Sequence, residues 1–230
     1  MVDTYTQKMT RNPTESRRLD KRLDLMVENI GYLLHPSITA ALPKAPAIAD
    51  VATGTGGFLL RVRDLYPEGT FDGSDISPAA FPPPGDLPEN VTFTVLDSAT
   101  SFIVNRYADA PTRVVRKNLR LLQGKFGAVF REQASYGWDT LPTHMQEAGL
   151  HLVVRDVVSS DRISNTRGRA TANRVRVFLA FARLMAERGA PGAMAIEEID
   201  RLEMNIPNDI KSGAYLRHDI HVSCGRKSLN

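Results

Sequence analysis

The chain has 230 residues, of which 42% are hydrophobic and 24% charged, with a formal net charge of +3. This length supports one domain with a sizeable core, and the slight positive charge is no argument for nucleic-acid binding, which needs a clustered basic face. One cysteine, Cys224, excludes an internal disulfide, and no apolar run approaches the ~20 residues that span a bilayer.

The N-terminal part of the chain predicts one helix. Asn12 and Pro13 are a good helix start, because a capping side chain precedes a proline in the first turn. Apolar residues then recur at helical spacing from Leu19 to Leu33, and His35-Pro36 predicts the end of the helix. We expect residues 1–46 to form a helical cap that is joined by a linker to residues 47–230, within one compact domain overall.

Strands and helices alternate over the rest of the chain. Hydrophobic patterns predict strands at 47–52, 70–74, 91–96, 126–131, 150–158 and 215–223. They predict helices at 57–66, 112–122, 140–148, 169–188 and 196–204. Strands that are separated by helices indicate an α/β protein whose parallel sheet is covered on both faces.

A glycine-rich turn follows the first strand and is the most informative feature of the chain. The run from Asp50 to Gly57 contains Gly54 and Gly56, and a second apolar run ends in Asp75 about twenty residues later. This layout is typical of a nucleotide-binding βαβ unit, where glycines permit a sharp turn and the acid accepts hydrogen bonds from ribose hydroxyls. The acid at the head of the turn would repel a pyrophosphate but would receive an ammonium group.

The turn resembles that of class I S-adenosylmethionine (SAM) methyltransferases. Asp50-Val-Ala-Thr-Gly-Thr-Gly56 carries the likeness, and Gly73-Ser-Asp-Ile-Ser-Pro78 and Leu87–Asp97 are similar to the second and third strands of the fungal specialised-metabolite type. Gly31–Ile38 is similar to that group too. The specific part of the resemblance covers residues 28–97, and a weaker part covers 111–227. It implies a Rossmann-like sheet with helices on both faces and an N-terminal helical cap on the substrate side.

The resemblance implies a set of cofactor-binding residues for SAM. Asp50 would hold the methionine ammonium group, Asp75 would accept from the ribose, and Asp97 and Ser98 would lie along the adenine. The whole implied set is Asp50, Thr53, Gly54, Gly56, Asp75, Ile76, Asp97 and Ser98.

Catalytic residues are harder to assign, because methyl transfer from a sulfonium is an in-line displacement that depends mostly on positioning. A base is needed only for a hydroxyl acceptor or a protonated amine. The candidates are His35, Tyr107 and Glu132, with His144 as a further histidine, and the competing interpretation of His35 is a capping histidine before proline. Tyr32 and Trp138 are candidates for lining an aromatic acceptor pocket. His218 and His221 point to opposite faces of a predicted strand, so we expect no metal site.

The chain departs from the family's pattern after the third strand. Residues 101–107 look like the family's fourth strand, yet only three residues separate them from Asp97. Three residues span at most ~11 Å, whereas the usual arrangement has two strands between these two, a lateral distance of ~14 Å. The fourth strand is therefore altered or missing, or the third is displaced, or a partner chain supplies the element by exchange in a homodimer. The Pro-Gly-Gly turn that precedes the family's fifth strand is also absent.

Two functions remain open at this point. The first is a SAM-dependent methyltransferase that acts on a small specialised metabolite, with oxygen as the preferred acceptor atom. The second is a methyltransferase-like protein without methyl transfer, either a cyclase or isomerase of a natural-product intermediate or a non-catalytic subunit partner. For both we expect a cytoplasmic protein without nucleic-acid or membrane partners.

Overall fold

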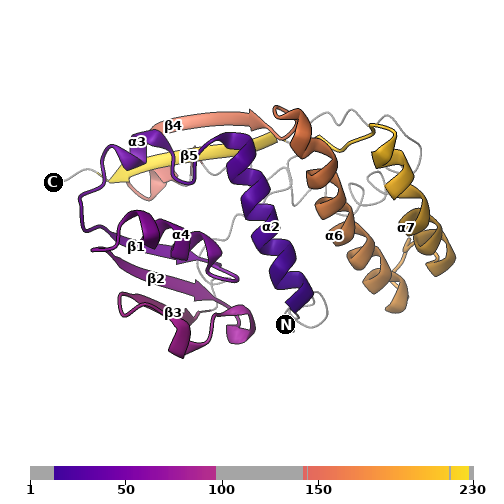
Figure 1. The fold of residues 1–230 in the computed structure, drawn as a ribbon, viewed down its shortest axis with the longest axis horizontal. Helices are drawn as coiled ribbons and strands as arrows, with labels where there is room; N and C mark the ends of the chain where they lie inside the picture. The colour runs from indigo at the N-terminus through magenta and orange to yellow at the C-terminus, as the bar shows by residue number, and fades with distance from the viewer. Residues whose placement is uncertain (1–12, 97–141, 144, 218, 228–230) are drawn as a thin grey trace. The chain divides into compact units, whose positions relative to one another are not determined.

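The computed structural model describes residues 13–96, 142–143, 145–217 and 219–227 (Figure 1). Its contacts divide the chain into two units, residues 1–103 and residues 104–230, and each has its own core. The expected division into a cap of residues 1–46 and a cofactor domain of residues 47–230 stays a prediction. No helix in the described ranges is long and apolar enough to cross a membrane.

The first unit begins with a long helix, α2 (Pro13–Ile30). Its predicted end at His35-Pro36 is wrong, because Gly31 already stops the helix with a φ of 90°. The Gly31 N–H donates to the carbonyl of Val27 at 2.8 Å, which is a glycine C-cap. His35 and Pro36 instead begin a second, one-turn helix, α3 (Pro36–Thr39).

Three parallel strands follow, in the order β1-β2-β3. They are β1 (Ala47–Val51), β2 (Thr70–Asp75) and β3 (Val91–Val95), with helix α4 (Gly57–Leu65) between the first two. Two short 3-10 turns, η1 (Pro78–Ala80) and η2 (Pro84–Asp86), connect β2 to β3. In register, Asp50 of β1 lies opposite Gly73. The strands and the helix confirm the predicted βαβ unit to within one residue at each end.

The core of the first unit lies between α4 and one face of this sheet. Leu59 and Val62 of α4 pack with Phe71 and Val91, and all four side chains are buried. Alternate strand positions such as Asp72 are exposed. This core fixes α4 across β1 and β2, and therefore fixes the turn that joins β1 to α4.

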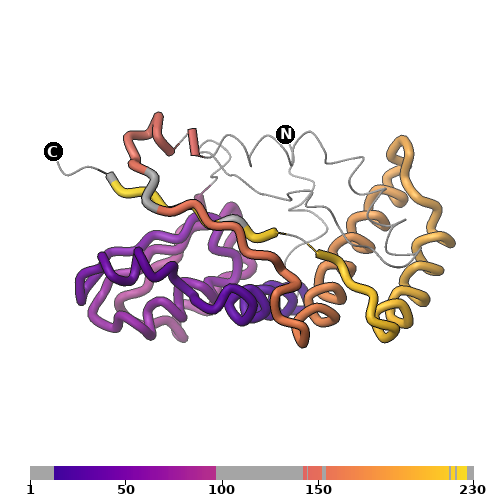
Figure 2. Tube along the Cα trace, turned by 90° about the horizontal axis from the view of Figure 1, so that it is seen from above, coloured from indigo at the N-terminus to yellow at the C-terminus, as the bar shows by residue number. Residues whose placement is uncertain are grey.

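The second unit pairs two long strands, β4 (Leu150–Ser159) and β5 (Asp219–Lys227). They are antiparallel, and Figure 2 shows them running side by side. The expectation that all strands join one parallel sheet is therefore wrong for this pair. The reason is that two helices lie between them, α6 (Arg167–Glu187) and α7 (Ile196–Lys211), preceded by a short turn, η4 (Ser164–Thr166).

Helices α6 and α7 pack antiparallel, so the chain enters and leaves the pair at the same end. Arg183, late in α6, donates to Asp200 early in α7 at 2.7 Å, whereas Gly168, early in α6, lies against Ile210 late in α7. An antiparallel helix pair brings the following strand back in the opposite direction, so β5 runs antiparallel to β4.

The last strand begins four residues later than its hydrophobic pattern predicts. Residues 214–217 are not in the strand, because the Leu216 N–H donates to the buried hydroxyl of Thr171 at 2.9 Å instead of to a neighbouring strand. Ala214 and Leu216 join the core of the helix pair.

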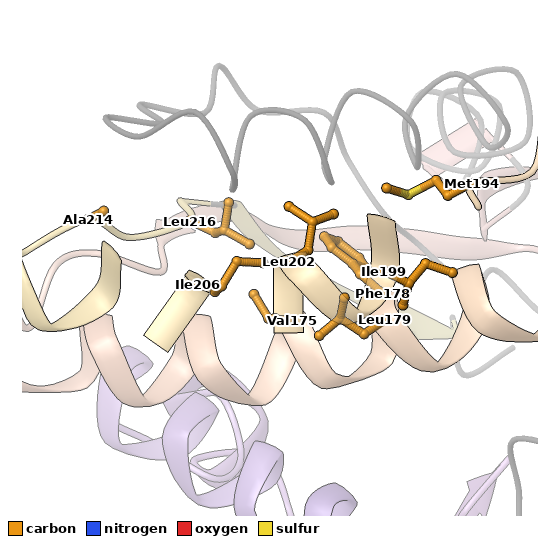
Figure 3. Close-up of a cluster of buried hydrophobic side chains, with 9 residues drawn as sticks. All are labelled: Val175, Phe178, Leu179, Met194, Ile199, Leu202, Ile206, Ala214 and Leu216. Atoms are coloured by element: carbon orange, nitrogen blue, oxygen red, sulfur yellow. The ribbon is translucent and has the colours of Figure 1, made fainter. Parts of the chain in front are cut away.

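Helix α7 is longer than predicted and continues through Pro207 to Lys211. A proline in a helix interior costs ~3 kcal/mol, but the turns on both sides of Pro207 carry apolar side chains that pack in the core. Figure 3 shows this cluster, which comprises Val175, Phe178, Leu179, Met194, Ile199, Leu202, Ile206, Ala214 and Leu216. Burial of the apolar face therefore outweighs the local cost of the proline.

The remaining predicted elements fall largely outside the described residues. This holds for the strand-like segment 101–107, the helix at 112–122 and the strand at 126–131. Of the helix at 140–148, residues 142–143 and 145–147 are helical.

Candidate functional site

The turn between β1 and α4 is built from an unusual backbone. Gly54 and Gly56 have φ values of 58° and 74°, and Ala52 has a φ of 61°. Left-handed backbone favours glycine, so the conformation explains both glycines and makes Ala52 a strained exception. The turn is tied to the next strand, because the Thr53 N–H donates to the carbonyl of Ser74 at 2.9 Å.

Gly56 is required for a second reason, which is the ring of Phe93 from β3. A Cβ on Gly56 would lie 2.3 Å from Cζ of Phe93, and a Cβ on Gly73 would lie 2.5 Å from the same ring. Gly54 has more room, since the nearest atom to its Cβ position is Cδ1 of Leu19 at 3.8 Å. The ring of Phe93 therefore requires both Gly56 and Gly73 to be glycines.

Asp50 stands at the head of the turn with a half-buried carboxyl group. Its Oδ2 accepts from the hydroxyl of Thr53 at 2.6 Å. Burial raises the pKa of the Asp50 carboxyl above its ordinary value, the Thr53 hydrogen bond opposes this shift, and the negative charge of Asp75 adds to it. A cation placed beside Asp50 would stabilise the ionised carboxylate and so oppose the rise in its pKa.

Asp75 ends β2 and faces the same turn. Its Oδ2 accepts the Gly54 N–H at 2.9 Å and its Oδ1 accepts the Ser77 N–H at 3.3 Å, so the carboxylate is held from both sides. Each carboxylate oxygen has two lone pairs, so one oxygen can accept more than one hydrogen bond. The carboxylate therefore supports the turn at the end of β2. Ile76 follows directly and is half-buried.

Helix α2 covers the outer side of the turn. The Thr55 hydroxyl donates to Oδ1 of Asp20 at 2.6 Å and accepts the Gly57 N–H at 3.3 Å. One turn further along α2, Asp24 forms an ion pair with Arg61 of α4 at 2.6 Å.

The structure thus brings together Asp50, Thr53, Gly54, Gly56 and Asp75 of the predicted cofactor set. Sequence reasoning missed Asp20, Thr55 and Phe93. Leu19 belongs to a recognised apolar stripe, and Asp20 is its neighbour, but nothing in one sequence connects that helix to a turn 35 residues away.

His35 and Tyr32 lie together at the connection from α2 to α3. The His35 Nδ1 accepts the Ser37 N–H at 3.1 Å, so this histidine is the N-cap of α3. Its ring meets that of Tyr32 edge-on, with centroids 5.2 Å apart. The capping interpretation of His35 therefore has direct structural support.

Five predicted site residues lie outside the described ranges, namely Asp97, Ser98, Tyr107, Glu132 and Trp138, and so does His144. His218 and the side chain of His221 also lie outside them. Within the described part of the chain, no three His, Cys, Asp or Glu side chains are grouped so that they could hold a metal ion.

The chemistry of the turn follows from its two carboxylates. Asp50 and Asp75 place negative charge at the carboxyl end of β1 and β2, which is where ligands bind in open α/β sheets. The arrangement disfavours a pyrophosphate and favours a ligand with a cationic group and vicinal hydroxyls.

Comparison with known proteins leaves the family open. No family model matches the chain, and no curated protein matches it. A crystal structure of a candidate sarcosine dimethylglycine methyltransferase from Galdieria sulphuraria is 11% identical, with a TM-score of 0.36 over 91% of this chain and 86% of that one. The structure of YjhP from E. coli is 13% identical, with a TM-score of 0.37 over 97% of this chain and 98% of that one. Likenesses this weak support no inference about activity.

Proposed function

We propose that the chain is a SAM-dependent methyltransferase that acts on a small specialised metabolite, with oxygen as the preferred acceptor atom. The observation that carries the cofactor half of this proposal is the pair of carboxylates at the turn. Asp50 would receive the ammonium group of the cofactor. Asp75, whose Oδ2 accepts the Gly54 N–H at 2.9 Å, would accept hydrogen bonds from its ribose hydroxyls.

The acceptor groups of the turn fit the proposed cofactor. SAM carries an ammonium group, a carboxylate, a sulfonium and a ribose but no phosphate, so its ammonium group complements Asp50 while its ribose hydroxyls complement Asp75. Gly54 and Thr53 would line the same turn. When bound, SAM supplies a methyl group that is activated by the positive sulfur.

In this proposal the described residues of the turn bind and orient the cofactor. Asp50, with its raised pKa, binds a cation better once it is ionised, so cofactor affinity should rise with pH through the pKa of its carboxyl group. His35 is a weaker candidate for the base, because its Nδ1 already accepts the Ser37 N–H as the N-cap of α3. The base, where an acceptor hydroxyl requires one, is sought among Tyr107 and Glu132. The specialised metabolite and the oxygen acceptor rest on the sequence resemblance.

The test is calorimetric titration of the full chain with SAM and S-adenosylhomocysteine. Asp75→Asn keeps an oxygen for the Gly54 N–H but removes the charge from the ribose acceptor. Because a hydrogen bond to a charged group contributes ~1.5–3 kcal/mol, we expect a loss of affinity of about 10- to 150-fold. Asp72→Asn is the matched control, since Asp72 is an exposed acid on the same strand.

Binding of S-adenosylhomocysteine that Asp75→Asn weakens and Asp72→Asn does not would support the cofactor site. Acceptor screening by mass spectrometry would then separate methyl transfer from a cyclase, an isomerase or a non-catalytic subunit. A wild-type chain that binds neither ligand would refute the proposal. The expected homodimer with exchanged elements is tested separately, by light scattering of the purified chain.

A further inference from the structure

We propose that Asp20 determines which class of nucleotide the turn accepts. Its carboxylate, which comes from α2, occupies the place at the start of α4 that a phosphate group would otherwise take, and so restricts the turn to adenosine ligands without phosphate. The inference concerns the site of the proposed function and names a specificity-determining residue that the sequence did not indicate.

Helix α4 brings no anion of its own to its N-terminus. Its N-cap is Gly56, which makes no side-chain capping bond, and its first turn contains no acidic residue. The first N–H groups of a helix lack intrahelical partners and carry partial positive charge, so an anion is stabilised there. In dinucleotide-binding folds the pyrophosphate fills this position.

In this chain the carboxylate of Asp20 takes that position at the N-terminus of α4, and the side chain of Thr55 links it to the helix. The Thr55 hydroxyl accepts the N–H of Gly57, the first residue of α4, and donates its proton to Oδ1 of Asp20 at 2.6 Å. The same Oδ1 lies 3.0 Å from the position that a Cβ on Gly57 would take. A carboxylate oxygen is therefore already in contact with the start of the helix.

The packing of α2 keeps this carboxylate in place. Leu23, three residues after Asp20, lies with its Cδ2 3.7 Å from the Cβ position of Gly57, and Leu19 lies against Gly54. Asp24 adds the ion pair with Arg61 at 2.6 Å. Contacts on both sides of Asp20 thus hold its backbone against the turn, and the hydrogen bond from Thr55 orients its carboxylate.

A phosphate at the start of α4 would meet this carboxylate at close range. Asp50 and Asp75 add two further negative charges at the same turn, so the helix N-terminus alone cannot compensate. An adenosine ligand that carries a zwitterionic amino-acid group in place of the phosphate meets less repulsion from Asp20, because its ammonium offsets the charge of its carboxylate. The residue therefore selects against the phosphate-containing ligands that bind at the helix N-terminus in dinucleotide-binding folds.

The experiment compares three ligands on the full chain, namely ADP, adenosine and S-adenosylhomocysteine, by calorimetric titration. The test variant is Asp20→Asn, which keeps an acceptor for the Thr55 hydroxyl but has no charge. We expect it to bind ADP at least about tenfold more tightly than the wild type, because one close negative charge is removed. Adenosine affinity should change by less than about threefold, since adenosine carries no phosphate.

The matched control is Asp72→Asn, which removes an exposed acid of β2 that lies outside the turn. It changes net charge equally, so an ADP gain of the same size in this variant would overturn the proposal. An unchanged ADP affinity in Asp20→Asn would also overturn it. Asp20→Ser provides a second uncharged substitution, with a hydroxyl in place of the carboxylate. Folding of every variant is checked by thermal unfolding.

A titration of the wild type alone provides a further test of the proposal. Binding of ADP by the unmodified chain as tightly as S-adenosylhomocysteine would show that Asp20 excludes nothing. Failure of the proposed function gives a different result. A wild type that binds no S-adenosylhomocysteine still leaves the ADP affinities of Asp20→Asn and Asp72→Asn to be compared, and that comparison decides the role of Asp20.

Discussion

Gly56→Ala is expected to destabilise the first unit far more than Gly54→Ala. Both glycines have left-handed φ values, 74° and 58°, so each substitution costs ~1–2 kcal/mol from backbone strain. Only at Gly56 does the added Cβ clash with a neighbour, because Cζ of Phe93 would lie 2.3 Å away, whereas the nearest atom at Gly54 is 3.8 Å away. Overpacking of this kind adds ~1–3 kcal/mol, which gives a total of about 2–5 kcal/mol for Gly56→Ala.

Urea denaturation of the two variants measures these differences directly. Combining Gly56→Ala with Phe93→Leu should recover the steric part, because the smaller side chain vacates the space that the ring occupies. The two substitutions should then be non-additive by ~1 kcal/mol or more. Equal destabilisation by Gly54→Ala and Gly56→Ala, together with additivity in the double variant, would refute the role assigned to Phe93.

Three further substitutions test the turn and the second unit. Asp50→Asn should raise the free energy of unfolding at pH 7, because the folded protein holds this carboxyl with a raised pKa and so pays to ionise it. The gain in stability should shrink as the pH falls towards 3.8, the ordinary pKa of the group. A difference in stability that does not depend on pH would contradict the assignment. Ala52→Gly should stabilise the protein by ~0.5–1 kcal/mol in the same assay, since it relieves a φ of 61°, and destabilisation would contradict this. Thr171→Val should cost ~1–3 kcal/mol by leaving the buried Leu216 N–H without its acceptor, whereas Thr171→Ser, which keeps the hydroxyl, should cost less.

The βαβ unit could be predicted because its signals are local. The strand from Ala47, the left-handed positions at Gly54 and Gly56 and the acid at Asp75 all follow from nearby residue types, and the structure confirms the boundaries of these elements to within one residue. The end of α2 was predicted wrongly although its signal was local too. Gly31 stops the helix as a C-cap, and Pro36 starts the next one.

The second unit shows where local patterns stop being sufficient. Hydrophobic alternation predicted β5 from residue 215, but Thr171 takes the Leu216 N–H and the strand starts at Asp219. The direction of β5 relative to β4 depends on how α6 and α7 pack. That packing joins residues such as Arg183 and Asp200, which no periodicity connects.

By itself the sequence determined a glycine-rich turn between a strand and a helix, with Asp50 just before the turn and Asp75 at the end of the next strand. Such a turn needs backbone conformations that few residue types other than glycine adopt, so the glycines alone predict it. Only the tertiary structure decided that Phe93 lies behind Gly56 and that Asp20 reaches the start of α4 through Thr55. These contacts join residues that are far apart along the chain, and packing selects them because each closes a gap or satisfies a hydrogen bond that the local segment leaves open.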